Sequence, residues 1–174
     1  MPVYALDDLE PTISPTAYVH PDAVVIGDVV IGNEASVWPS AVLRGDHGRI
    51  VIGARTSIQD GTIVHTTDEW HTVVGDDCVV GHNVHLEGCV VEDRCLIGSG
   101  SVVLNRARIE RGSVVGASAL VTEDTVVPAG SMALGVPARS RPMDSDEQAT
   151  WIDYGVREYV RSGKQYRAGL RRLR

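Results

Sequence analysis

The sequence predicts an all-β solenoid, a parallel β-helix built from six-residue repeats, followed by a C-terminal α-helix. Aliphatic residues recur at every sixth position through most of the chain, small or β-branched residues recur four positions later, and glycine often follows the aliphatic residue. A period of six fits neither a helix face nor a simple strand alternation, and it is typical of hexapeptide solenoids. Each repeat is therefore expected to form one side of a stacked coil.

The aliphatic series defines the register of about six expected coils. Its members are Ile13, Val19, Val25, Ile31, Val37, Leu43, Ile52, Ile58, Val64, Val74, Val80, Leu86, Val91, Ile97, Val103, Ile109, Val115, Val121 and Val127. The second inward positions carry small or β-branched residues such as Ala41, Thr62, Cys78 and Cys95. A narrow three-sided interior needs small residues there and leaves no room for rings, which agrees with the lack of Phe.

The chain divides into a solenoid domain at 1–142 and a C-terminal helix at 143–174, which we expect to pack on the coils. The helix is predicted from Asp144 or Ser145 as its cap and from an apolar face that includes Ile152 and Val156. Two insertions interrupt the repeats, three extra residues within 46–51 and four within 66–73. Insertions leave a solenoid at its corners and commonly build the functional face.

Composition narrows the classes of function. The 174 residues carry a net charge of −7, which disfavours nucleic-acid binding and attraction to membranes. No apolar stretch is long enough to span a bilayer, and no signal pattern opens the chain. Cys78 and Cys95 fall at equivalent positions of adjacent coils and are expected to be packed, reduced thiols. We therefore expect a cytoplasmic protein.

Repeat counting brings two polar residues together. His65 follows the inward Val64, and Glu87 follows the inward Leu86, so both side chains should point outward. The 22 residues between them equal one coil of 18 plus the four-residue insertion. Their Cα atoms should therefore lie about 5 Å apart on adjacent coils, close enough to share a metal ion.

Two further histidines bear on this site. His82 should lie near a corner on another side of the coil, from which it could reach such a site on a neighbouring subunit. His85 points outward on the same strand as Glu87 and is a candidate ligand or a neighbour of the ligands. Mixed imidazole and carboxylate ligands suit zinc, and also iron, cobalt or manganese.

Several motifs resemble those of the γ-class carbonic anhydrase family, which includes relatives named for the carnitine operon, phenylacetate catabolism and ferripyochelin binding. The resemblance spans about residues 10–160. Its matching segments are Ser36-Val37-Trp38-Pro39, Val42-Leu43-Arg44-Gly45-Asp46, Ile52 to Gly61, Val64-His65, Val80-Gly81-His82, Leu86-Glu87-Gly88-Cys89 and Gly135-Val136-Pro137-Ala138-Arg139.

The resemblance implies a left-handed parallel β-helix that assembles as a homotrimer, with a metal ion held at each subunit interface. Zinc is the expected metal, with iron or cobalt as alternatives. His65 matches the first ligand, and His82 matches the ligand contributed across the interface. Glu87 stands where the family has a third histidine. Glu87 could serve as the ligand, His85 could replace it, or the site could be degenerate.

The resemblance also implies roles for residues around the metal. Arg44 and Asp46 match an arginine and an aspartate near the family's active site, and Gln59 matches the glutamine that orients the metal-bound water. Asp60 matches the carboxylate that pairs with the arginine across the interface, so Arg44 and Asp60 are expected to fix the trimer.

Proton transfer to solvent is expected to involve three other residues. Asp68 falls where one family member has a proton-shuttling glutamate, with Glu69 as an alternative. His47 replaces that member's other acidic residue, and Tyr159 matches a helix tyrosine near the site.

The expected activity is the reversible hydration of CO2 to bicarbonate at the metal site, a carbonate dehydratase type of lyase. Two alternatives stay open. One is a hexapeptide-repeat acyltransferase that uses an acyl-CoA donor with a histidine as general base. The other is a trimeric metal- or ligand-binding protein without catalytic activity.

Overall fold

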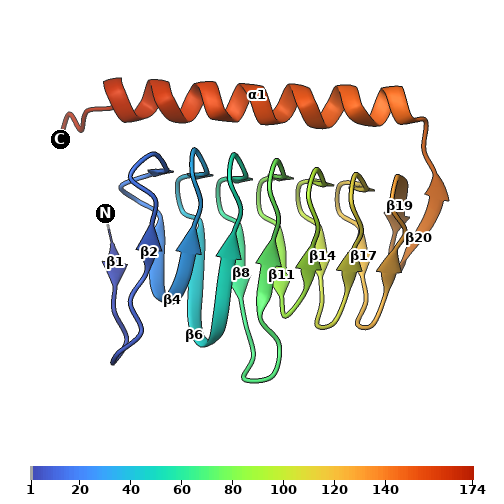
Figure 1. Ribbon diagram of the computed structural model, residues 1–174, viewed down its shortest axis with the longest axis horizontal. Helices are drawn as coiled ribbons and strands as arrows, with labels where there is room; N and C mark the ends of the chain where they lie inside the picture. The colour runs from blue at the N-terminus through green and yellow to red at the C-terminus, as the bar shows by residue number, and fades with distance from the viewer. Residues whose placement is uncertain (1) are drawn as a thin grey trace.

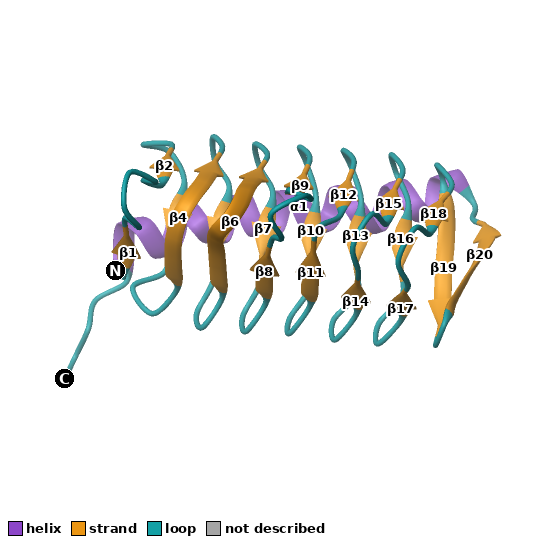
Figure 2. Cartoon of the chain, turned by 90° about the horizontal axis from the view of Figure 1, so that it is seen from below, coloured by secondary structure: helices purple, strands orange, loops and turns teal. Residues whose placement is uncertain are grey.

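The computed structural model describes residues 2–174, which form a parallel β-helix with one long helix laid along it (Figure 1). The coils stack side by side, and each contributes short strands to flat faces (Figure 2). Two long strands, β4 (Val24–Ile31) and β6 (Val42–Ile52), turn a corner and join two of these faces into one twelve-stranded sheet. The predicted solenoid is therefore confirmed.

We call the parts of this sheet the first and second faces. The first face continues from β6 through β8 (Ile63–His65), β11 (His85–Glu87), β14 (Val102–Val103) and β17 (Leu120–Val121). The second continues from β6 through β9 (Thr72–Val74), β12 (Val90–Val91), β15 (Arg108–Ile109) and β18 (Val126–Val127). At the N-terminal end, β1 (Val3–Tyr4) and β2 (Thr12–Ile13) pair with β4.

The third face is a separate eight-stranded sheet. Its strands are β3 (Tyr18–Val19), β5 (Ser36–Val37), β7 (Ser57–Ile58), β10 (Val79–Val80), β13 (Leu96–Ile97), β16 (Val114–Val115), β19 (Ser131–Gly135) and β20 (Ala138–Pro142). All pairs are parallel except the last, in which β20 pairs antiparallel with β19. The third face thus contains a strand from each of seven coils, one more coil than the repeat pattern predicts. The repeat pattern does not predict this last coil because its inward position is occupied by Ala133 rather than by a larger aliphatic residue. Ala133 pairs with Val115 of the preceding coil.

The interior is a stack of the predicted inward residues. Val25, Leu43, Val64, Leu86 and Val103 are each 0% exposed and lie in register on successive coils. Removing such side chains from water is the main stabilising term of the fold.

The paired cysteines are also placed as predicted. Val79 pairs with Leu96, which brings Cys78 and Cys95 onto adjacent coils, and the Cys95 amide donates to Cys78 Sγ at 3.5 Å. Both thiols are free and buried.

The helix α1 (Ser145–Gly169) covers the third face and runs back to the N-terminal end of the solenoid (Figure 1). Ile152 and Val156 pack with Val79 on the strands beneath. Gly155 lets the helix approach closely, since a Cβ there would stand 2.9 Å from Cγ2 of Val79. Among residues 2–174, no helix is long and apolar enough to cross a membrane.

The two insertions differ in form. Residues 66–71 leave the solenoid as an irregular loop between β8 and β9, as expected. Residues 46–49 instead stay within strand β6 as a bulge at the corner, because Gly45 pairs with Gly27 and Ile50 pairs with Val29. Asp46 and His47 therefore lie in a bulge of β6 at the corner, between the residues that pair with β8 and those that pair with β9.

Candidate functional site

The outward side chains of the first face form a polar ladder across three coils. Arg44 pairs in register with His65, and His65 pairs in register with Glu87. The prediction that His65 and Glu87 occupy equivalent places on adjacent coils is confirmed. Gly88, which follows Glu87, has a positive φ of 56°, and a Cβ there would clash with the Asn105 side chain. Glycine is thus required to turn the chain directly after the ladder.

His65 is held between two carboxylates. Its Nε2 lies 3.1 Å from Asp46 Oδ1, and its Nδ1 lies 3.4 Å from Glu87 Oε1. Asp46 also forms an ion pair with Arg44, and Glu87 Oε2 lies 3.2 Å from Nε2 of His85. We call these five residues the first-face cluster.

Both carboxylates of this cluster are held ionised. Burial alone would raise the pKa of Asp46, but hydrogen bonds from Arg44 and His65 outweigh it and lower the pKa from its ordinary value. Burial likewise acts to raise the pKa of Glu87, and hydrogen bonds from His85 and His65 outweigh it there. Because both ring nitrogens of His65 face these carboxylates, neither is free to take a proton from a substrate.

A second histidine–carboxylate pair extends from the cluster to solvent. His47 Nδ1 lies 2.9 Å from Asp68 Oδ1, and the His47 ring stands edge-on to the His65 ring at 6.1 Å between centroids. Asp68, rather than Glu69, makes this contact, and its side chain is 83% exposed. Two of the residues expected to carry protons, Asp68 and His47, are therefore in contact, and His47 also stands beside His65.

Asp60 and His82 form another pair at the corner between the third and first faces. His82 Nδ1 lies 2.9 Å from Asp60 Oδ2, and both side chains are about half exposed. Among the described residues, no partner contacts His82 Nε2. Sequence reasoning placed Asp60 opposite Arg44 of another subunit and missed this contact. The sequence contains a signal for it, because Asp60 and His82 are separated by the same 22 residues as His65 and Glu87.

Gln59 and Tyr159 border this corner rather than the first-face cluster. Gln59 directly precedes Asp60 and is 4% exposed. Tyr159 of α1 packs against Trp38, with ring centroids 5.6 Å apart. Burial raises the pKa of Tyr159, and the charge of nearby Asp60 raises it further. Neither side chain contacts the first-face cluster among the contacts of residues 2–174.

The candidate ligands of the expected metal ion lie in two separate places within one chain. In the described part of one chain, no three His, Cys, Asp or Glu side chains are arranged to hold an ion. His65 and Glu87 offer two donors side by side, while His82 lies around the corner. A three-ligand set would need His82 of a second copy, and His65 would have to release one of its carboxylates.

Comparison with known proteins identifies the family. The carnitine operon protein CaiE of Escherichia coli O157:H7 is 38% identical over 159 residues, which cover 91% of this chain and 81% of that protein. The chain belongs to the CaiE family of hexapeptide-repeat proteins. Residues 71–105 also match the family described as "Bacterial transferase hexapeptide (six repeats)". The left-handed parallel β-helix with a C-terminal helix is therefore confirmed, as is the resemblance to carnitine-operon relatives.

Two solved structures share nearly the whole fold, and a third shares part of it. A hexapeptide transferase family protein of Anaplasma phagocytophilum superposes with a TM-score of 0.91 at 34% identity, covering 95% of this chain and 98% of that one. A Bacillus cereus protein named as a candidate acetyltransferase gives a TM-score of 0.93 at 31% identity, covering 95% and 96% of the two chains. A perosamine N-acetyltransferase of Caulobacter crescentus, solved with CoA and GDP-perosamine, gives 0.56 at 25% identity, covering 78% and 58%.

Proposed function

We propose that this protein is an acyltransferase that uses an acyl thioester of the coenzyme A class, with His82 as its general base. The observation that carries the proposal is the 2.9 Å contact between His82 Nδ1 and Asp60. A carboxylate that accepts the Nδ1 proton fixes the ring and leaves Nε2 as the proton acceptor. Among the described histidines of the predicted site, His82 best combines an orienting carboxylate with a half-exposed, unengaged nitrogen.

The proposed reaction balances without a metal ion. His82 Nε2 takes the proton from an amine or hydroxyl acceptor as its nitrogen or oxygen attacks the thioester carbon. The carbon–sulfur bond then breaks, and the proton passes from His82 to the departing thiolate. The products are the acylated acceptor and the free thiol, and His82 returns to its starting state.

The comparisons support acyl transfer from a coenzyme A thioester more than they support CO2 hydration. Two relatives that overlap nearly the whole chain are named as a hexapeptide transferase and a candidate acetyltransferase. A more distant relative, named as an N-acetyltransferase, was solved with CoA bound. We infer the same donor class for this chain.

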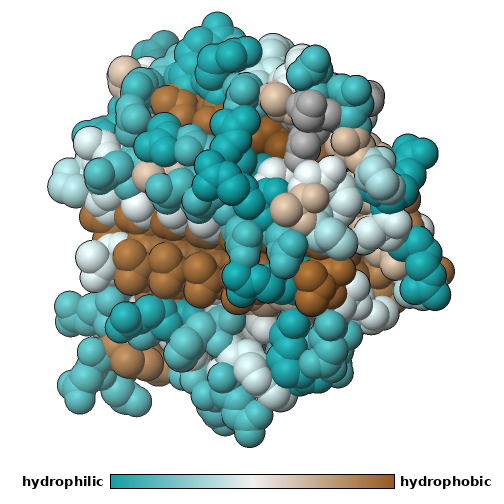
Figure 3. Space-filling view, turned by 45° about the vertical axis from the view of Figure 1, so that its right-hand side comes forward, coloured by the Kyte–Doolittle hydropathy of each residue, from teal (hydrophilic) through white to brown (hydrophobic). Residues whose placement is uncertain are grey.

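We further propose that the site is completed in a homotrimer. Beside the corner of His82, an outward ladder of the first face runs through Val42, Ile63, His85, Val102 and Leu120. Ile63 is 38% exposed. Figure 3 shows a hydrophobic band across the solenoid between hydrophilic margins. A second copy packed on this ladder would bury aliphatic surface and enclose His82 in a cleft.

One observation favours a second candidate, the metal-dependent hydration of CO2. His65 and Glu87 lie in register on adjacent strands, as two ligands of one ion would. With His82 of a second copy they would form a two-histidine, one-carboxylate set, which suits zinc and also iron or cobalt. A bound ion would supply Lewis acidity for the hydration. Gln59 and Asp68 would then retain the water-orienting and proton-carrying roles that the resemblance implies.

The test measures thiol release from acetyl-CoA with a panel of amine and alcohol acceptors. We expect wild type to be active, and both His82→Gln and Asp60→Asn to lose about 100-fold or more in kcat. His20→Gln is the matched control, because His20 also lies near an aspartate on the third-face side, 3.9 Å from Asp22. Activity that survives His82→Gln, or falls equally in His20→Gln, would refute His82 as the base.

A further inference from the structure

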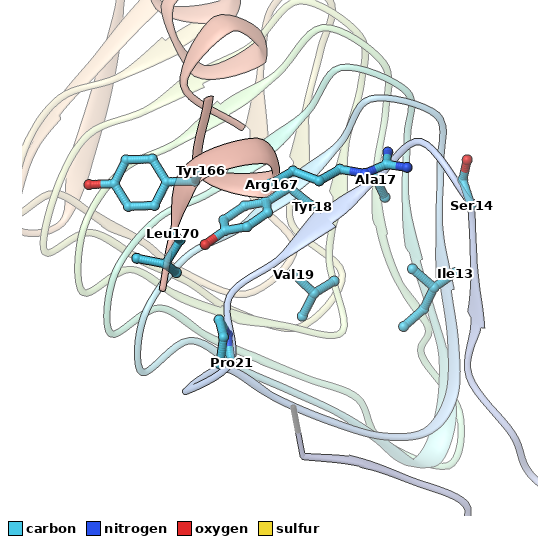
Figure 4. A pocket seen from close by; sticks show the side chains of 9 residues that line it. All are labelled: Ile13, Ser14, Ala17, Tyr18, Val19, Pro21, Tyr166, Arg167 and Leu170. Carbon is cyan, nitrogen blue, oxygen red and sulfur yellow. The ribbon is translucent and has the colours of Figure 1, made fainter. Parts of the chain in front are cut away.

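The N-terminal end of the solenoid contains a pocket that the proposed function does not use. It has a volume of about 390 Å³ and lies between the first coil and the end of α1 (Figure 4). Its lining residues are Ile13, Ser14, Ala17, Tyr18, Val19, Pro21, Tyr166, Arg167 and Leu170. Most of this surface is aliphatic, because the first coil leaves its inward residues without a further coil beneath them.

A buried hydroxyl without a partner lies in the wall of this pocket. Tyr18 is 7% exposed, and its Oη has no hydrogen-bond partner among the described residues. In Figure 4 the hydroxyl points towards Leu170. Burial raises the pKa of Tyr18 to about 12, with smaller contributions from Tyr166 and Asp22, so the hydroxyl keeps its proton. An unpaired buried donor is costly, and a ligand oxygen would satisfy it.

Positive charge lies on the same side as this hydroxyl. A neighbouring pocket of about 260 Å³ shares Pro21 and Leu170 with the first one and is also lined by Arg171 and Arg172. Lys164 and Arg161, earlier on α1, pair with Glu34 and Glu158. In the described chain, neither Arg171 nor Arg172 pairs with a carboxylate, so both cations are available to an anion.

We propose that the two pockets together bind a small monocarboxylate with an alkyl or aryl body. The body lies against Ile13 and Val19, and the carboxylate accepts a hydrogen bond from the Tyr18 hydroxyl beside Arg171. Asp22 also lines the second pocket and repels an anion, but the two arginines that line the same pocket, Arg171 and Arg172, leave it with a net positive charge. Apolar lining with a few convergent polar groups is the usual form of a small-molecule site.

This site is separate from the corner of His82. Tyr18 and Val79 lie on strands of the third face with β5 and β7 between them, three strand spacings apart, or roughly 14 Å. Loss of carboxylate binding would therefore leave acyl transfer intact, and loss of acyl transfer in His82→Gln would leave carboxylate binding intact.

Octanoate is the probe, and isothermal titration calorimetry of the full chain is the measurement. We expect one octanoate per chain with a dissociation constant of the order of 1 mM, and at least fivefold weaker binding of 1-octanol, which lacks the charge. Arg171→Gln should weaken octanoate binding about fivefold, whereas Arg157→Gln, an equal charge change earlier on α1, should leave it unchanged.

Tyr18→Phe provides a second test, in which stability and octanoate binding should change in opposite directions. Because the variant removes an unpaired buried hydroxyl, its Tm should equal or exceed that of wild type, while octanoate binding should weaken tenfold or more. The proposal is overturned if octanoate produces no binding heat at 10 mM, or if Tyr18→Phe binds it as tightly as wild type. It is also overturned if Arg157→Gln weakens binding as much as Arg171→Gln.

Discussion

Replacing Glu87 with glutamine tests the electrostatic design of the first-face cluster. The amide has nearly the same shape, but it removes the charge that faces His65 Nδ1 at 3.4 Å and His85 Nε2 at 3.2 Å. A hydrogen bond to a charged group contributes about 1.5–3 kcal/mol when well buried. The Glu87 side chain is 27% exposed and both contacts are long, so we expect a combined loss of about 1–2 kcal/mol.

That loss converts to a fall in Tm of about 2–8 °C for a chain of this size. Circular dichroism melts at pH 7, with the protomer concentration held fixed, measure it. Asp68→Asn is the control, since Asp68 is 83% exposed and its contact with His47 should contribute under about 1 kcal/mol.

The pH dependence of the difference in Tm between wild type and Glu87→Gln provides the sharper test. Because the folded pKa of Glu87 is lowered from its ordinary value of 4.5, its carboxylate adds stability above that pH and loses it as the pH falls through the folded pKa. The gap in Tm between wild type and Glu87→Gln should therefore shrink as the pH is lowered below 4.5. A gap that is absent at pH 7, or that does not shrink as the pH is lowered below 4.5, would refute the reasoning.

Three further predictions concern the solenoid and its helix. Leu86→Ala, at a 0% exposed position, should lower the free energy of unfolding by about 2–5 kcal/mol in chemical denaturation, and a loss below 1 kcal/mol would contradict the core described above. Gly155→Ala should lower Tm although alanine favours helices, because its Cβ would stand 2.9 Å from Val79; a higher Tm would show that the helix can shift. Cys89, whose pKa burial raises to about 12, should resist iodoacetamide at pH 8 in the folded protein and react in urea, as followed by mass spectrometry.

Much of the fold follows from the sequence because the repeat is a strict geometric rule. Each inward aliphatic side chain must stack on its equivalent, so counting residues gives the register of side chains far apart in sequence. The rule placed Glu87 beside His65, and the same interval of 22 residues applies to Asp60 and His82. The second pair was missed because Asp60 was assigned to another subunit by resemblance.

Other features depend on packing that no repeat encodes. The first insertion stays within β6 as a bulge because the strand pairs with neighbouring coils on both sides of it, up to Gly45 and again from Ile50, which the sequence does not reveal. Gly155 argues against a continuous helix by propensity, yet the close third face requires it. The end pocket forms only because α1 returns along the whole solenoid and brings Leu170 beside Tyr18.

The central claim is that His82 acts as a base in acyl transfer, and the metal dependence of thiol release from acetyl-CoA tests it most directly. Wild-type protein stripped of metal, with less than a tenth of an ion per chain, should release thiol in the presence of the best acceptor as fast as untreated protein. His82→Gln should be inactive in both forms. The account is contradicted if neither wild-type form transfers an acyl group while CO2 hydration is present, lost on stripping and restored by zinc.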